Sequence, residues 1–248
     1  MRTRHSGIAG IVMAAGQGTR LASAIPKVMQ LVGGKPILKH VVDTGITSGL
    51  DPIIVVIRPG VEVSSAAAGT ITVNQPPDES GTAYATEIGL IEIPSSIKTV
   101  AVLYGDSPLL QAATVNDVVK IVTDTDAVAG LSWAQIPDAG SFGRVVIDDY
   151  GIVRGVIEAP EATSAELLIS TVNAGPCAFR ADWLRDHLPS VKPSPTSGER
   201  YLTDLFGIAI SEGSIVRGHE ITDLDETIGC DDLERLKAAN LAYARRDG

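Results

Sequence analysis

An apolar segment near the N-terminus runs directly into a glycine-rich loop that is followed by cations. Residues 8–13 are apolar, Gly16 and Gly18 follow at once, and Arg20 and Lys27 come close behind. Because glycine carries no Cβ, the backbone N–H groups of such a loop can approach an anion closely, and the cations add full positive charge. A tight turn with solvated charges would explain the glycines alone, but not Arg20 and Lys27. The segment therefore predicts a buried strand followed by a phosphate-binding loop.

The spacing of the loop excludes two common nucleotide-binding motifs. A dinucleotide fingerprint needs a third glycine where this chain has Leu21. A Walker-type loop needs a glycine and a lysine followed by serine or threonine after four spacer residues, and this loop has no such sequence. The phosphate-binding loop must therefore belong to another class.

Short apolar runs alternate with helical patterns through the first half of the chain. We expect strands at residues 8–13, 53–57, 71–73 and 100–104, and helices at 36–48, 82–91 and 114–123. Pro36 would stand in the first turn of its helix, where proline is favoured. This alternation indicates right-handed crossovers and an α/β fold with a doubly wound, mainly parallel sheet.

The pattern changes after about residue 126. We expect a hairpin around residues 148–151, a strand at 168–179, and helices at 201–211 and 232–246. The chain is therefore expected to form one domain over 1–248. Its parts would be a phosphate-binding half at about 8–125, a second lobe at about 126–230, and a C-terminal helix at about 231–246.

The charge balance limits the partners. The chain has 30 acidic and 20 basic residues and a net charge of -10, so it repels nucleic acid and anionic membranes, and a small anion suits the cationic loop better. No apolar run approaches the roughly 20 residues that span a bilayer. Cys177 and Cys230 lie far apart, which fits a reducing cytoplasm and indicates neither a disulfide framework nor a zinc site. Removal of residues 1–15 as a signal peptide would delete the first strand, so we reject that interpretation.

Acidic residues at two places are candidate metal ligands. Asp106 follows the strand at 100–104, and open α/β sheets bind ligands at the carboxyl ends of their strands. Asp106 could instead cap the following turn. A second acidic cluster could be a solvated turn, or one of its members could complete a metal site; it contains Glu220, Asp223, Asp225 and Glu226.

Other polar residues are weak signals when taken alone. Gly81 could bring backbone groups against a planar ring and Thr82 could cap a helix, although an ordinary strand-to-helix connection explains both more simply. The polar residues of the second half are individually more typical of turns, caps or satisfied core positions.

Taken in order, these motifs resemble the uridylyltransferase domain of the bifunctional N-acetylglucosamine-1-phosphate uridylyltransferase, within the sugar-phosphate nucleotidylyltransferase family. The resemblance covers nearly the whole chain. It is carried by Ala14-Ala-Gly-Gln-Gly-Thr-Arg20, Pro26-Lys-Val28, Gly81-Thr82, Leu103-Tyr-Gly-Asp106, Pro108-Leu109, Gly143-Arg144, Glu158 with Ala162-Thr163, Asn173-Ala-Gly175 and Gly198-Glu-Arg-Tyr-Leu-Thr-Asp204.

The resemblance implies a Rossmann-like, mixed and mainly parallel sheet of the nucleotide-diphospho-sugar transferase type, with a sugar-binding lobe over the second half. It implies Mg²⁺ as cofactor and catalysis by Arg20, Lys27 and Asp106. The nucleotide would be held by Ala14, Ala15, Gly16, Gly18, Thr19, Arg20, Lys27, Gln75, Gly81 and Thr82. The sugar phosphate would be held by Tyr104, Gly143, Glu158, Asn173 and Thr203. The metal ion would be held by Asp106 and Asp225.

Three departures from the family pattern bear on these expectations. The loop at residues 75–80 is one residue longer than in the family, which affects the base contact of Gln75. Asp225 stands where the family has asparagine. The chain ends after the helix that leads into a hexapeptide-repeat acetyltransferase domain in the family, so we expect no acetyl transfer.

The expected reaction joins UTP and N-acetylglucosamine 1-phosphate into a UDP-sugar and pyrophosphate. No general base is needed, because a phosphomonoester with a second pKa of about 6 is largely dianionic at neutral pH. One alternative is a related enzyme that uses CTP, dTTP or GTP, or another phosphate acceptor. A second alternative, from a different class, is a non-catalytic module that senses nucleotide sugars.

Overall fold

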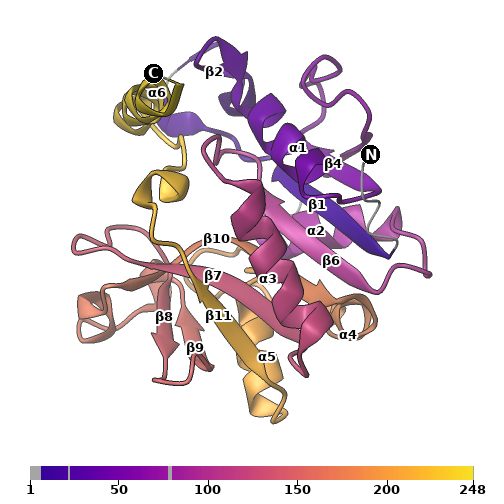
Figure 1. Cartoon of the computed structure of the whole chain (residues 1–248), viewed down its shortest axis with the longest axis vertical. Helices are drawn as coiled ribbons and strands as arrows, with labels where there is room; N and C mark the ends of the chain where they lie inside the picture. The colour runs from indigo at the N-terminus through magenta and orange to yellow at the C-terminus, as the bar shows by residue number, and fades with distance from the viewer. Residues whose placement is uncertain (1–6, 22, 78–79, 248) are drawn as a thin grey trace.

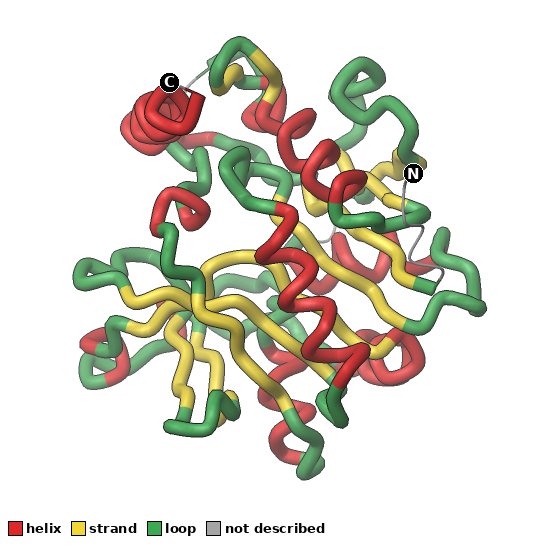
Figure 2. Tube along the Cα trace, viewed as in Figure 1, coloured by secondary structure: helices red, strands yellow, loops and turns green. Residues whose placement is uncertain are grey.

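A mixed sheet runs through the computed structural model, which describes residues 7–21, 23–77 and 80–247. Within these residues nine strands form the sheet, and Figures 1 and 2 show it crossing the whole molecule. Seven of them follow the order β11 (Val216–Glu220), β7 (Ala129–Gln135), β10 (Thr171–Arg180), β6 (Thr99–Tyr104), β1 (Ile8–Ala14), β4 (Ile53–Ile57) and β5 (Ile71–Asn74).

The first half of the chain forms the parallel part of the sheet. β1 pairs in parallel with β4 and β6, and β4 pairs in parallel with β5. Helices α1 (Ile37–Thr47) and α3 (Ala112–Asp124) cover one face, and α2 (Thr82–Ile91) covers the other (Figure 1). Alternate residues of β1 serve the two faces, since Ile11 packs with the α2 side and Val12 with the α1 and α3 side. The predicted doubly wound sheet is therefore confirmed.

The second half adds antiparallel strands. β10 runs antiparallel to β6 and β7, and β11 returns parallel to β7. The hairpin of β8 (Arg144–Ile147) and β9 (Val153–Ile157) extends from β10 and confirms the turn predicted around residues 148–151. The remaining α-helices are α4 (Ala181–His187), α5 (Asp204–Ser211) and α6 (Leu233–Asp247).

The smaller elements connect these layers. A short hairpin of β2 (Leu31–Val32) and β3 (Lys35–Pro36) packs beside α6 (Figure 1). Single turns of 3-10 helix occur at Thr19–Leu21, Lys27–Met29, Ala159–Glu161, Glu166–Leu168, Leu188–Ser190 and Leu224–Thr227. None of the helices in the described part of the chain combines the length and apolar character needed to cross a membrane.

Four local predictions are corrected by the structure. Pro36 lies in β3 with an extended backbone, so α1 begins one residue later. The expected strand at 168–179 begins only at Thr171, because Leu168 ends a 3-10 turn. The helix expected from residue 201 begins at Asp204, after a turn. Thr82 does not cap α2, because its hydroxyl oxygen accepts the N–H of Leu202 (2.8 Å).

Candidate active site

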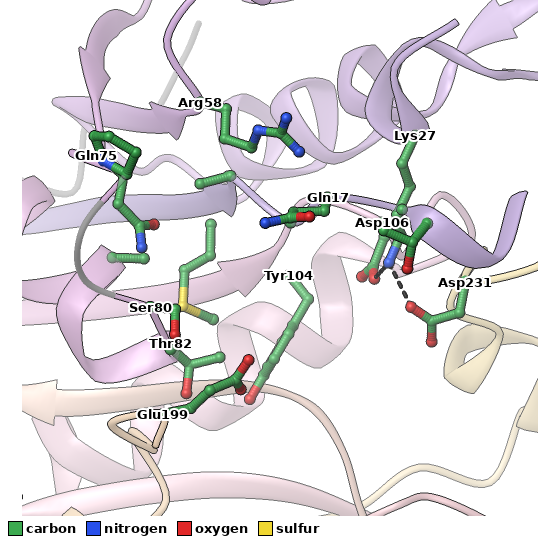
Figure 3. A pocket seen from close by; sticks show the side chains of 18 of the residues that line it. Gln17, Lys27, Arg58, Gln75, Ser80, Thr82, Tyr104, Asp106, Glu199 and Asp231 are labelled. Carbon is green, nitrogen blue, oxygen red and sulfur yellow. Dashed lines mark hydrogen bonds and ion pairs between the residues drawn. The ribbon is translucent and has the colours of Figure 1, made fainter. Parts of the chain in front are cut away.

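A cavity of about 770 Å³ opens at the carboxyl ends of β1, β4, β5 and β6 (Figure 3). This is the edge at which open α/β sheets bind their ligands. The cavity is lined by Met13, Ala15, Gly16, Gln17, Gly18, Thr19, Arg20, Lys27, Arg58, Pro59, Gln75, Pro76, Pro77, Ser80, Gly81, Thr82, Ala85, Tyr104, Asp106, Glu199 and Asp231. Most residues predicted at the nucleotide therefore share one cavity.

The glycine-rich loop forms one wall of this cavity. Gly18 has a φ of +63°, and a Cβ at this position would lie 2.6 Å from the Cβ of Lys27. Glycine is therefore required here for the loop to close against Lys27. A Cβ on Gly16 would meet no atom within 4 Å, so the loop backbone is open to the cavity at that point. Leu21 is buried and anchors the end of the loop.

Lys27 is the centre of a charged cluster. Its side chain is only 9% exposed, and its ammonium group donates hydrogen bonds to Asp106 and Asp231 (Figure 3). Arg20 approaches the same carboxylate, with 3.3 Å between its Nη2 and Oδ1 of Asp231. Burial alone would lower the pKa of Lys27, but the two carboxylates outweigh it, so the pKa is raised and Lys27 stays charged. Burial likewise opposes ionisation of Asp231, but Lys27 and Arg20 bring its pKa below its usual value.

The structure joins Asp231, not Asp225, to Asp106. The N–H of Cys230 donates to the carbonyl oxygen of Asp106 (2.9 Å), which places Asp231 beside it. Asp225 is absent from the cavity lining, and its carboxylate accepts bonds from Arg245 at 3.0 and 3.1 Å. In this structure Asp231 therefore lies beside Asp106 in the place expected for Asp225, and the Asp225 carboxylate is paired with Arg245 of α6 instead.

The donor set of Asp106 and Asp231 fits Mg²⁺. Magnesium is held in proteins by one or two carboxylates together with phosphate oxygens and water, and these two aspartates supply hard oxygen donors at the cavity wall. The described part of the chain contains no group of three or more His, Cys, Asp or Glu side chains that could form an all-protein metal cage. Two carboxylates facing a large open cavity are consistent with a metal ion shared with a ligand.

The opposite end of the cavity is formed by the residues after β5 and before α2. Gln75 is buried, and its backbone N–H donates to the carbonyl of Ile57 (2.8 Å). Gly81 has a φ of +111° and lies against the backbone of residue 200. Asp78 and Glu79, within the loop expected to be longer than in the family, lie outside the described residues. Ala14 is not among the lining residues, because its side chain is buried under Gly105.

The residues predicted at the sugar phosphate gather beside the cavity. The Thr203 hydroxyl donates to Oε1 of Glu158 (2.6 Å). The backbone N–H of Asn173 donates to the carbonyl of Gly143 (2.8 Å), and Gly143 lies against the Glu158 side chain. Tyr104 lies beside Glu158 and Asn173 and also lines the cavity. Burial raises the pKa of Tyr104 well above its usual value, and the neighbouring Asn173 side chain opposes this shift. These five residues, although far apart in sequence, therefore form one cluster.

Two properties of this cluster suit a polar ligand. Oδ1 of Asn173 is buried and has no hydrogen-bond partner among the described residues. Burial raises the pKa of Glu158, although the hydrogen bond from Thr203 partly opposes this shift. A buried acceptor without a donor is unfavourable unless water or a ligand supplies one, so Oδ1 of Asn173 is open to a hydroxyl or amide donor.

The lining also contains Arg58, Pro59 and Asp231, which no motif of the sequence predicted, and Gln17 and Glu199, which lie within the family motifs but were given no ligand contact. Arg58 follows β4 directly, and no hydrogen bond or ion pair of its side chain occurs among the residues that the structure describes. A cation directly after a buried parallel strand was the available signal for Arg58. Asp231 lies two residues before α6 and outside every motif of the sequence, so it gave no separate signal.

Comparison with known proteins identifies the family. Residues 10–190 match the family described as the MobA-like NTP transferase domain. The chain belongs to this family. It is 35% identical over 242 residues to the bifunctional protein GlmU of Brevibacillus brevis and 34% identical over 242 residues to that of Shouchella clausii. Each match covers 97% of this chain but only 52% and 53% of the relative, so the chain spans about half the length of these curated relatives.

Solved structures agree on the fold. A putative glucose-1-phosphate thymidylyltransferase from Bacillus anthracis, in complex with a sucrose, superposes with a TM-score of 0.77 at 18% identity, covering 95% of both chains. A UDP-glucose pyrophosphorylase complexed with UDP-glucose superposes with a TM-score of 0.75 at 16% identity, covering 96% of this chain and 99% of the other. The fold is that of the nucleotide-diphospho-sugar transferases.

Proposed function

We propose that the protein transfers a uridylyl group from UTP to N-acetylglucosamine 1-phosphate, giving UDP-N-acetylglucosamine and pyrophosphate. The observation that carries this proposal is the placement of two different polar sites around Tyr104. On one side lies the cavity with its glycine loop, Lys27 and Arg20, and on the other lies the buried cluster around Glu158 and Asn173. The similarity to the GlmU proteins supports this choice of substrates.

The first site suits a triphosphate. Backbone N–H groups of the loop at residues 16–19 would approach the phosphate oxygens, while Arg20 and Lys27 would compensate their charge. Gln75 and Gly81, at the far end of the cavity, would face the base. Asp106 and Asp231 would hold Mg²⁺, which neutralises charge on the phosphates and the leaving group when bound.

The second site would hold the sugar phosphate. Glu158 and Asn173 offer acceptors for the hydroxyl and amide donors of the sugar, and Thr203 fixes the Glu158 carboxylate. Tyr104 would separate the sugar from the nucleotide. The acceptor's phosphate oxygen would then face the α-phosphorus of UTP across the cavity.

The chemical step is an in-line displacement. A phosphate oxygen of the acceptor forms a bond to the α-phosphorus, and the bond from that phosphorus to the bridging oxygen of the β-phosphate breaks, releasing pyrophosphate. The attacking phosphate is already dianionic near neutral pH, so no side chain has to remove a proton. Lys27 and Arg20 stabilise the charge that develops on the departing pyrophosphate.

A pyrophosphate-release screen tests the proposal. The purified protein is incubated with Mg²⁺ and each of UTP, CTP, dTTP and GTP against several sugar 1-phosphates and non-sugar phosphates. We expect turnover with UTP and N-acetylglucosamine 1-phosphate. Turnover with another pair alone would assign a different nucleotidylyltransferase activity, and nucleotide-sugar binding without turnover of any pair would indicate a sensing module.

A further inference from the structure

Arg200 joins the two proposed substrate sites. We propose that its ion pair with Glu87 positions the segment at residues 199–203, so that nucleotide bound at Gly81 and Thr82 strengthens binding of the sugar phosphate at Glu158 and Thr203. This inference rests on the proposed function. Arg200 acts here as a positioning residue and does not itself touch the reacting atoms.

The backbone of this segment is tied to the start of α2. The N–H of Arg200 donates to the carbonyl of Ser80 (3.2 Å), and its carbonyl accepts the N–H of Ala83 (2.9 Å). Two residues on, the N–H of Leu202 donates to the hydroxyl oxygen of Thr82 (2.8 Å). These three bonds connect the proposed base-binding wall directly to the segment that leads into α5.

Gly81 makes this close approach possible. A Cβ on Gly81 would lie 2.3 Å from the carbonyl oxygen of Arg200 and 2.5 Å from its nitrogen. Both are backbone atoms held by hydrogen bonds, so neither could move aside cheaply. The glycine expected to face the base therefore also packs against the segment that holds the sugar side.

The Arg200 side chain holds the segment from the other direction. Its Nη1 donates to Oε2 of Glu87 in α2 (2.6 Å), its Nε to the carbonyl of Val191 (2.9 Å) and its Nη2 to the carbonyl of Leu188 (3.0 Å). The side chain is only 13% exposed, so these charge-assisted bonds are little screened by solvent. The guanidinium fork reaches three acceptors at once, which a lysine cannot reproduce with the same geometry.

The segment carries functional groups at both of its ends. Glu199 lines the cavity, as Figure 3 shows, and Thr203 donates to Glu158 in the sugar-side cluster. A ligand that contacts Gly81 and Thr82 therefore acts on the same backbone bonds that hold the segment positioning Thr203. A nucleotide that favours the arrangement of Gly81 and Thr82 suited to the sugar side thereby favours binding there, which is positive coupling between the two sites.

Binding measurements test this coupling. Calorimetry gives the Kd of N-acetylglucosamine 1-phosphate with Mg²⁺, alone and with a saturating UTP analogue whose α,β-bridging oxygen is replaced by methylene, so that no transfer occurs. For the parent we expect the analogue to lower this Kd about tenfold, within the usual range of coupling between sites. The Kd ratio is the Kd of N-acetylglucosamine 1-phosphate without the analogue divided by its Kd with the analogue. In Arg200→Lys and Glu87→Gln this ratio should fall close to one, while the analogue still binds.

Arg185→Lys is the matched control. Arg185 is also half-buried and donates to backbone carbonyls, those of Ala181, Ile93 and Pro94, but it is not part of the cavity wall. This variant should keep the parent Kd ratio. Glu87→Gln retains an acceptor for Arg200, so it tests the charge even where an Arg200 variant fails to fold.

Three results distinguish the outcomes. Folded Arg200→Lys and Glu87→Gln proteins that keep the parent Kd ratio would overturn the coupling role, and so would a parent ratio of one. A parent that binds the nucleotide analogue but does not bind the sugar phosphate under either condition would overturn the proposed acceptor together with the coupling.

Discussion

Two aspartates of nearly equal exposure test the position of the proposed Mg²⁺ site. The Asp231 side chain is 30% exposed and contacts Lys27 and Arg20, while that of Asp225 is 28% exposed and pairs with Arg245. We expect Asp231→Ala to lower kcat/KM by about two to three orders of magnitude, the range typical of losing one preorganised electrostatic contact. Asp225→Ala loses a partly exposed ion pair worth at most about 1 kcal/mol of unfolding free energy, and its rate should match the parent's.

The stability of the Asp231 variant separates misfolding from loss of function. Without Asp231, Lys27 keeps Asp106 as a carboxylate partner, so its buried charge remains paired. A hydrogen bond to a charged group contributes roughly 1.5–3 kcal/mol, and partial exposure reduces this, so we expect a loss of about 1–2 kcal/mol in unfolding free energy. Denaturant titration at neutral pH measures this loss, and a protein with such a loss remains folded in the assay.

The assay is pyrophosphate release over a Mg²⁺ titration for the parent, Asp231→Ala, Asp231→Asn and Asp225→Ala. Asparagine keeps one oxygen donor without the charge, so Asp231→Asn should recover part of the rate and need more Mg²⁺ for half-maximal velocity. The reasoning is refuted if Asp225→Ala loses activity and needs more Mg²⁺ while Asp231→Ala matches the parent in both respects.

Three further predictions concern the same cavity and its neighbour. Lys27→Ala and Arg20→Ala should each lower turnover by roughly two to three orders of magnitude, with Lys27 the larger effect because it is buried; parent rates in both folded variants would contradict the phosphate-binding role. Arg58→Ala should raise KM for the triphosphate with little change in kcat, and an unchanged KM would place Arg58 outside the nucleotide site. Burial raises the pKa of Glu158. The contribution of this side chain to the free energy of unfolding therefore falls as the pH rises from the pKa of Glu158 in the unfolded chain through its pKa in the folded protein. Glu158→Gln should therefore show a higher Tm than the parent at pH 7.5, a smaller difference near pH 4, and weaker sugar-phosphate binding; a Tm difference independent of pH would contradict this.

The sequence identified what depends on local pattern. The apolar run at residues 53–57 predicted a buried strand of the parallel sheet, and the glycine loop after β1 predicted the edge of the sheet at which the cavity opens, because each signal lies within a few consecutive residues. Asp231 was missed because its position depends on a backbone bond between Cys230 and Asp106, which are distant in sequence. Asp225 was chosen from an acidic cluster, and nothing in that cluster showed that Arg245 would occupy its carboxylate.

The direction of β10 explains why the cavity and the cluster around Glu158 and Asn173 lie at the same edge of the sheet. In an entirely parallel sheet, the start of each strand lies at the edge away from the ligand. β10 runs antiparallel to β6, so its early residues, Asn173 among them, lie at the same edge as the carboxyl end of β6 that carries Tyr104. The β8 and β9 hairpin then extends from this part of β10 and leads to Glu158 directly after β9. The antiparallel insertion thus adds a second polar site to a nucleotide-type sheet, and a wholly parallel order could not bring Asn173 beside Tyr104.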